Sequence, residues 1–135
     1  MRVLFLALAM GAASCGDGSG PSEPTIDLTT SRSWDLPMPL TIVGDSRKLT
    51  ISGTIDVNEP CYDFRAFFGQ AQDTLVAWIE ADRRDGHCPQ ELARFAYTYT
   101  ISGLARGVQP LRVVYERLGP PTFVEVAFEG AVDIQ

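Results

Sequence analysis

The stretch CYDFRAFFGQAQDTLVAWIEADRRDGHC, from Cys61 to Cys88, decides the fold, because it holds two runs in which the character of the side chains alternates with period two. Such alternation is typical of β-strands, whose successive side chains point to opposite faces of a sheet. Between the runs, Gly69 to Asp73 has the length and polarity of a hairpin connection. We therefore expect two strands with one buried face each: Tyr62, Phe64, Ala66 and Phe68 on the first, and Leu75, Ala77, Ile79 and Ala81 on the second.

The same alternation continues on both sides of this stretch. The clearest half-buried strand covers 48–57, where Leu49, Ile51 and Val57 alternate with polar residues. No window shows helical periodicity, and turns rich in Gly, Pro and Asp separate the runs. The sequence therefore predicts an all-β fold, a two-sheet antiparallel sandwich of about seven or eight strands. The residues expected to face inward on the later strands are Phe95, Tyr97, Tyr99 and Ile101, then Leu111, Val113 and Tyr115, and finally Val124, Val126 and Phe128.

The composition limits the classes of partner. The chain has 135 residues, 45% of them hydrophobic and 21% charged, which suits one globular domain with short attachments. Its formal net charge is −6, and Lys48 is the only lysine. Nucleic acids and anionic lipid headgroups are bound by clustered Lys and Arg that neutralise phosphate charge. We therefore expect no nucleic-acid partner.

The N-terminus has the three-part layout of an export signal. Arg2 supplies the positive charge, an apolar run covers 3–10, and small residues fill 11–14 before Cys15. The apolar run is much shorter than the roughly 20 residues with which a helix crosses a bilayer, which argues against a transmembrane span. Residues 12–15, Ala-Ala-Ser-Cys, resemble the lipobox of bacterial lipoproteins, in which the cysteine becomes the lipid-modified first residue of the mature chain.

By this resemblance, residues 1–14 are a lipoprotein signal peptide and Cys15 is the lipid attachment site. Residues 15–24 lack large apolar side chains, so they are expected to form a flexible tether, which leaves 25–135 for the β-sandwich domain. The resemblance implies an exported protein of the bacterial cell envelope that is anchored in a membrane by its lipid. By similarity to enterobacterial sorting, Gly16 in place of Asp after the cysteine favours the outer membrane in a Gram-negative host.

The lipobox resemblance also accounts for the odd number of cysteines. The chain has three, and acylation of Cys15 leaves Cys61 and Cys88 as a pair, which an oxidising compartment favours as a disulfide. Such a bond would close a loop of about 27 residues, worth about 3.5 kcal/mol in the chain-entropy model. The alternatives are two free thiols, or a zinc or copper site formed with Asp85 and His87. Because Cys-x-x-Cys and His-x-x-His spacings are absent, we expect the disulfide, with no metal and no cofactor.

A later passage resembles a second family. Residues 101–114, ISGLARGVQPLRVV, resemble the Gly-Leu, turn, Gly and apolar-strand passage that joins two late strands in many bacterial immunoglobulin-like and fibronectin-like sandwiches. As a pattern, the resemblance covers the chain from Lys48 to Asp133. Gln109 and Pro110 occupy the place where those families commonly carry a tyrosine, so the tyrosine-corner hydrogen bond cannot form. The resemblance implies an immunoglobulin-like fold and no particular activity.

No pattern of residues indicates catalysis. The single histidine, His87, precedes Cys88, and no Gly-x-Ser-x-Gly elbow accompanies it. Acidic residues gather in the turn 82–86 and near Cys61, without the ligand number or spacing of a calcium loop. We therefore expect a non-catalytic, lipid-anchored envelope module with a binding or structural role, whose partner is an envelope protein or a glycan. The alternative is a metal or small-ligand binding protein that uses His87 and the nearby acidic residues.

Trp78 and Val76 define a candidate binding surface. They lie on the strand face opposite the expected core positions, so this strand is apolar on both faces. We expect the segment from Trp34 to Leu40, rich in proline and large apolar residues, to cover Trp78 as a lid, because small proteins rarely leave large apolar patches in water. The alternative is that Trp78 and Val76 form an exposed platform for a partner or a sugar ring, since tryptophan is enriched at binding hot spots.

Overall fold

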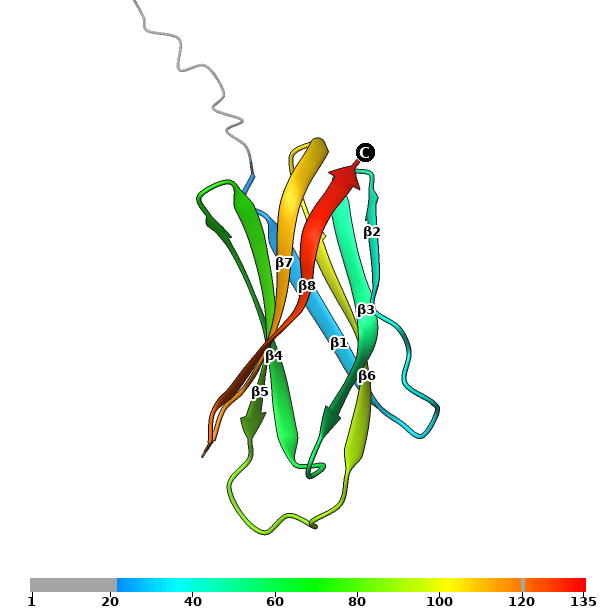
Figure 1. The fold of residues 1–135 in the computed structure, drawn as a ribbon, viewed down its shortest axis with the longest axis vertical. Helices are drawn as coiled ribbons and strands as arrows, with labels where there is room; N and C mark the ends of the chain where they lie inside the picture. The colour runs from blue at the N-terminus through cyan, green and yellow to red at the C-terminus, as the bar shows by residue number, and fades with distance from the viewer. Residues whose placement is uncertain (1–21, 120) are drawn as a thin grey trace, which may run out of the picture.

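Every regular element of the described chain is a β-strand (Figure 1). The computed structural model describes residues 22–119 and 121–135, so Cys15, the predicted signal peptide and most of the predicted tether lie outside it. The described residues contain no helix long and apolar enough to cross a membrane. The all-β prediction is confirmed. The strands are β1 (Thr25–Ser33), β2 (Thr41–Asp45), β3 (Lys48–Val57), β4 (Tyr62–Ala71), β5 (Thr74–Arg83), β6 (Ala93–Ser102), β7 (Gly107–Arg117) and β8 (Phe123–Ile134).

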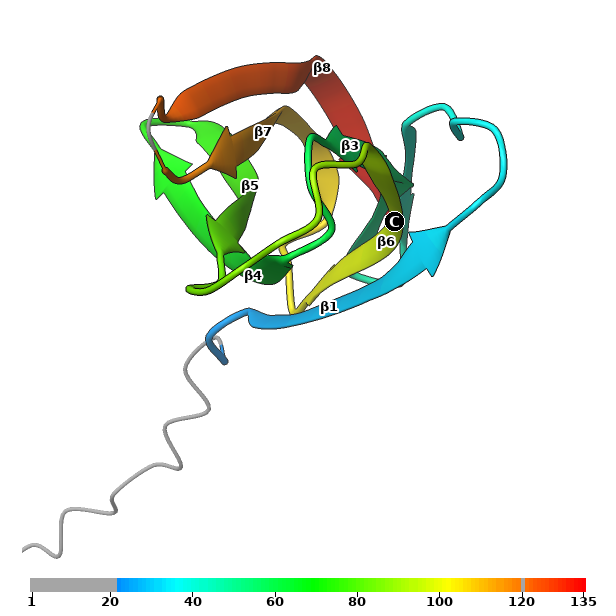
Figure 2. The ribbon, with the colours of Figure 1, turned by 90° about the horizontal axis from the view of Figure 1, so that it is seen from below.

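The strands form two four-stranded sheets that face each other across the core. The first sheet has the order β1-β6-β3-β2, and the second has the order β4-β5-β7-β8. Figure 2, seen along the strands, shows that the outline is nearly closed, with β1 beside β4 and β2 beside β8. The predicted two-sheet sandwich is confirmed, and the assignment to immunoglobulin-like sandwiches stays a prediction.

One strand pair departs from the predicted antiparallel arrangement. β5 and β7 are neighbours in the second sheet and run parallel. Parallel neighbours need a crossover connection, because a tight turn reverses the direction of the chain. Here β6, in the other sheet, provides that crossover, so the chain returns to β7 in the direction of β5. The expectation of an antiparallel sandwich is wrong for this pair.

The core lies between the sheets and is built by the predicted alternation. On β5 the expected inward residues are all buried, and on β4 Tyr62 is buried while the other three are partly buried against neighbouring core residues. Tyr99 is the largest fully buried side chain, and its hydroxyl donates to the carbonyl oxygen of Phe67 at 2.7 Å, which satisfies a polar group inside the core. The inward faces predicted for β3 to β7 are therefore confirmed at their central positions.

The last strand, β8, corrects the prediction in its first half. Val124 and Val126, expected inside, are 58% and 52% exposed. Phe128 is partly buried against the core, and Val132 and Ile134 beyond it are buried. The inward face of β8 therefore changes along the strand.

A β-bulge explains this change. Val113 of β7 pairs with Phe128, but the next residue, Val114, pairs with Val126, so Ala127 is an extra residue in β8. Because successive side chains of a strand alternate between the faces, one inserted residue exchanges the two faces from that point on. The regular spacing of apolar residues in the sequence does not reveal the insertion.

The bond between Cys61 and Cys88 is present, as predicted. It joins the residue before β4 to the β5–β6 connection, with Cα atoms 6.0 Å apart. Cys88 is buried, and the amide of Arg84 donates to the carbonyl oxygen of Cys61 at 2.9 Å. The disulfide thus secures two loops at one end of the sandwich.

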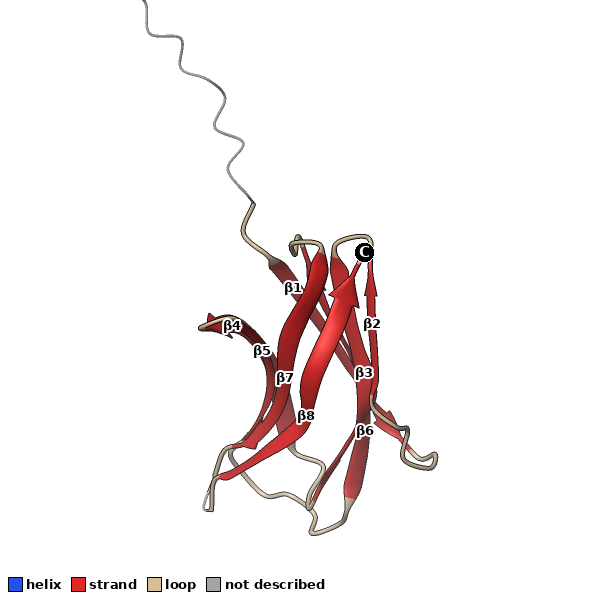
Figure 3. Ribbon diagram, turned by 45° about the horizontal axis from the view of Figure 1, so that its top comes forward, coloured by secondary structure: helices blue, strands red, loops and turns tan. Residues whose placement is uncertain are grey.

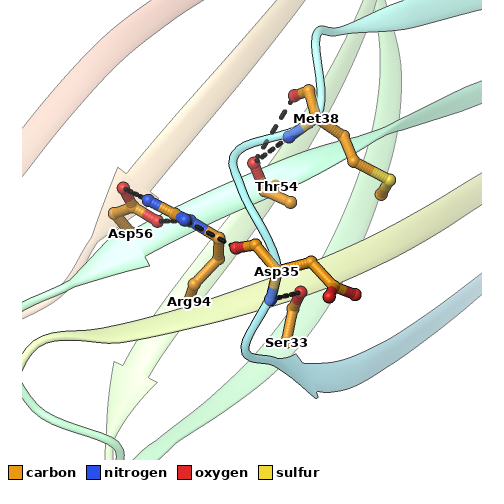
Figure 4. A network of polar contacts seen from close by, with 6 residues as sticks. All are labelled: Ser33, Asp35, Met38, Thr54, Asp56 and Arg94. Carbon is orange, nitrogen blue, oxygen red and sulfur yellow. Dashed lines mark hydrogen bonds and ion pairs between the residues drawn. The ribbon is translucent and has the colours of Figure 1, made fainter.

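The predicted lid over Trp78 is wrong. The segment 34–40 connects β1 to β2, which lie at opposite edges of the first sheet, so it has to pass β6 and β3 of that sheet. Contacts hold it there (Figure 4): the amide of Met38 donates to Thr54 Oγ1 at 3.2 Å, and Arg94 Nη1 donates to the carbonyl oxygen of Asp35 at 2.8 Å. Trp78 belongs to the second sheet, and this segment does not cover it.

Candidate binding surfaces

The outward face of the second sheet carries a row of large apolar side chains. Inward positions of β4, β5 and β7 fill the core, so the alternate positions point outward. The strand registers place Phe67 opposite Trp78, Trp78 opposite Val114, and Val114 opposite Val126. We call these four residues the apolar row; it crosses all four strands of the sheet.

The members of the row remain accessible. Phe67 is 39% exposed and Val126 is 52% exposed, while Trp78 and Val114 are half-buried. The rings of Phe67 and Trp78 lie 6.2 Å apart between centroids, at an interplanar angle of 39°. Val76, which sequence analysis paired with Trp78, is half-buried on the same outward face. The structure thus brings both residues of the candidate surface onto one open sheet face.

Charged residues border the apolar row on both sides. Arg65 lies 2.5 Å from Glu80 and 3.0 Å from Asp82, and Arg112 lies 3.0 Å from Glu129. Ion pairs this exposed contribute little to stability. They do not balance the charge of the face, because two arginines stand against three carboxylates and Glu116 lies opposite Glu80, so the border of the apolar row is polar with a negative excess.

A second feature is a cleft of about 350 Å³ between the sheets. Its lining residues come from the ends of β3, β5 and β7 and from the beginning of β8. Toward this end of the sandwich, β7 and β8 diverge from β3 and β6 (Figures 1 and 3). The bulge in β8 shapes it, because it turns Glu125 to the inward face, opposite Tyr115. A carboxylate cannot pack in an apolar core, so this part of β8 borders an open space. The lining also includes Met38, Ile55, Ile79 and Phe123.

Tyr115 of the cleft lining contacts a second tyrosine, Tyr97. The hydroxyls of Tyr97 and Tyr115 are hydrogen-bonded, and their rings lie 5.8 Å apart in an edge-to-face arrangement. Burial raises the pKa of both hydroxyls. Their hydrogen bond raises the pKa of Tyr97 and lowers that of Tyr115, and the nearby Glu125 carboxylate raises the pKa of Tyr115. Either hydroxyl can donate in this pair, because each tyrosine oxygen carries one proton and two lone pairs.

An arginine network beside the cleft holds one residue of its lining, Asp56, on the outward face of the first sheet (Figure 4). Arg94 contacts Asp56 through two parallel hydrogen bonds, of 2.6 Å from Nε and 2.8 Å from Nη2. These hydrogen bonds lower the pKa of Asp56. The third contact of Arg94, to the carbonyl oxygen of Asp35, holds the 34–40 segment beside the cleft. The charge of Asp56 is thus already neutralised by Arg94.

The region around His87 contains no such arrangement. His87 is exposed in the β5–β6 connection, and Cys61 and Cys88 are joined to each other, so neither offers a thiolate. No three His, Cys, Asp or Glu side chains of the described residues lie together in a way that could hold a metal ion. No observation on these residues favours the metal-binding alternative.

The cleft was not found by sequence reasoning. Its key residue, Glu125, lies between two valines that the alternation pattern places inside the core, so the pattern assigns the carboxylate to solvent. Only the register shift at the bulge reverses this assignment. The nearby proline-containing segment that supplies Met38 carried a signal, but it was assigned to the wrong sheet face.

Fold and surfaces together define a disulfide-bonded, two-sheet β-sandwich with one parallel strand pair, an apolar row on one outer face and a cleft between the sheets. Comparison of the chain with protein-family models, with curated proteins and with solved structures finds no significant match.

Proposed function

We propose that this protein is a non-catalytic, lipid-anchored binding module of the bacterial cell envelope. The lipobox resemblance at Cys15 supports the anchor and the compartment, and the Cys61–Cys88 disulfide is in keeping with an oxidising environment. The observation that carries the binding role is the apolar row, which lies exposed on a sheet face that no segment of the described chain covers.

The occupant we propose for the apolar row is an apolar patch on another envelope protein. An apolar centre with a polar border is the usual composition of a protein–protein interface, and tryptophan is enriched among the residues that dominate binding energy. Val114 and Val126 make up half of the row, and branched aliphatic side chains pack against apolar side chains but offer no aromatic plane to a sugar ring.

Site-specific photo-crosslinking in the cells that encode the protein tests this proposal. A crosslinking residue at position 126 should give a discrete, protease-sensitive adduct. The matched control is position 98, because Thr98 is exposed on β6 in the first sheet. Adding Trp78→Ser to the position 126 variant should remove the adduct, since it removes the largest side chain of the row.

The folding of the Trp78→Ser variant is checked by urea unfolding. Trp78 is half-buried, so the substitution should lower the free energy of unfolding by about 1 to 2 kcal/mol and leave the domain folded. An adduct that resists protease and disappears with glycan-degrading enzymes would assign the surface to a glycan. Equal adducts from positions 126 and 98, or none from 126, would refute a binding role for the apolar row.

A further inference from the structure

We infer that the cleft between the sheets is a second binding site, for a small organic cation with an apolar body and a protonated amine. The cleft has a volume of about 350 Å³, and small-molecule sites commonly measure roughly 300 to 1,000 Å³. Its lining combines apolar side chains with a few polar groups, which is the usual composition of a small-molecule site. The site is separate from the apolar row, which lies on the outward face of the second sheet.

The charge of the lining selects a cation. Among the described residues, Glu125 has no cationic partner within ion-pair distance. Asp56 is paired with Arg94, so it does not compensate another charge. Arg117, the cationic residue of the lining, lies with its guanidinium carbon 5.7 Å from the ring centroid of Phe123 and donates to Asn58 Oδ1 at 3.4 Å. Glu116 of the lining has no ion-pair partner either, so two unpaired carboxylates stand against one arginine and the lining is net negative.

An aromatic ring beside Glu125 fits the amine. Tyr115 lies directly opposite Glu125 across the β7–β8 ladder, whereas Phe123 of the same lining already contacts the Arg117 guanidinium. An ammonium group is attracted both by a carboxylate and by the faces of aromatic rings. The Tyr115 hydroxyl is hydrogen-bonded to that of Tyr97, and whichever of the two donates, the oxygen of Tyr115 keeps a lone pair for an N–H donor.

Apolar side chains beyond these groups fit the body of the ligand. Ile79 and Ala81 of β5 are buried beneath the opening, Ile55 of β3 borders it, and Met38 lines the side formed by the 34–40 segment. Methionine adapts its shape to irregular apolar ligands more readily than branched residues do. A ligand with an aryl or short alkyl body can therefore bury that part between the sheets while its amine meets Glu125 at the rim.

The test uses three small probes of the same shape and different charge. 2-Phenylethylammonium is the cation, 2-phenylethanol the neutral analogue and phenylacetate the anion. Each is titrated into the mature protein at neutral pH, and ¹⁵N NMR shifts report affinity and location. We expect the cation to bind most tightly, with shifts at β7, β8 and Met38, and phenylacetate to bind most weakly.

Two variants separate the role of Glu125 from a general charge effect. Glu125→Gln keeps the shape of the side chain and should weaken binding of the cation by about fivefold, while the affinity for 2-phenylethanol stays unchanged. Glu129→Gln removes the same charge from the outward face of the same strand and should change neither affinity. Equal affinities for the three probes, or an equal loss with both variants, would overturn the inference.

Discussion

Buried tyrosine hydroxyls set how this protein responds to alkaline pH. Burial raises the pKa of Tyr97 and of Tyr99, so both stay protonated in the folded state at a pH where an unfolded chain has begun to release these protons. The unfolded state then binds fewer protons than the native state, and the free energy of unfolding falls as pH rises. The stabilising contribution is complete below the ordinary tyrosine pKa of about 10 and is lost progressively above it.

This linkage predicts a steep alkaline loss of stability that Tyr99→Phe should reduce. Each such tyrosine contributes up to about 1.4 kcal/mol per pH unit above the unfolded pKa. Phe at position 99 cannot ionise, so its variant should lose less free energy of unfolding between about pH 9 and pH 11 than the parent does. Urea unfolding at several pH values measures how steeply the free energy of unfolding falls with pH in each protein. The variant also loses the hydrogen bond to Phe67, which changes the free energy of unfolding but not its slope against pH. Identical slopes would contradict the assignment.

At the scale of elements, β2 and β8 close one side of the sandwich by direct contact between their backbones. A Cβ atom at Gly44 of β2 would lie 2.2 Å from the carbonyl oxygen of Asp133 in β8, closer than atoms can approach. Beyond the end of β2, the amide of Arg47 donates to the carbonyl oxygen of Gln135 at 2.7 Å. This close approach requires glycine on the β2 side.

Gly44→Ala is therefore expected to separate β2 from β8. Overpacking of this kind costs about 1 to 3 kcal/mol, measured as the free energy of unfolding in urea. Gly69→Ala is the matched control, because the nearest atom to its Cβ would be Trp78 Cζ3 at 3.9 Å, an ordinary contact. The control should change stability by less than about 0.5 kcal/mol. If Gly44→Ala lowered the free energy of unfolding by as little as the control, the packing of β2 against β8 would not depend on this contact.

The strands and their connections differ in how far the sequence predicts them. Alternation predicts the strands and the inward faces of β3 to β7, because burying one face of each strand is what determines the register there. It fails at β8, where Ala127 shifts the register without changing the spacing of Val124 and Val126. It also fails to place the 34–40 segment, because sheet order decides which face that connection crosses, and sheet order depends on contacts distant in sequence.

The two candidate sites also differ in how far the sequence predicts them. Trp78 and Val76 could be assigned to an outward face because both belong to a regular strand whose inward positions are clear. The full apolar row could not, because it needs the parallel β5–β7 pairing and the shifted β7–β8 register. The cleft depends on the bulge, which leaves no local pattern, and on the β1–β2 connection, whose proline-rich pattern does not tell which sheet it crosses.

For the molecule as a whole, the two ends of the sandwich differ in what they carry. The described chain enters at the end where Pro24 lies beside Gly103, just after β6. The C-terminus lies at the same end (Figure 1). The cleft and the disulfide lie toward the other end, where β3 and β5 finish. The first described residues and the cleft therefore lie toward opposite ends of the sandwich.

The proposed lipid anchor at Cys15 is tested by Cys15→Ser. Serine has no thiol to acylate, so the variant should leave the membrane fraction or accumulate with its signal segment uncleaved, whereas Cys61→Ser with Cys88→Ser should stay membrane-bound. Cell fractionation with mass spectrometry of the N-terminus measures both. Because the apolar row and the cleft are built without residue 15, the released Cys15→Ser protein should also retain the affinity of the parent for 2-phenylethylammonium. Normal processing with unchanged membrane partitioning would contradict the lipoprotein assignment and leave both surface assignments untouched.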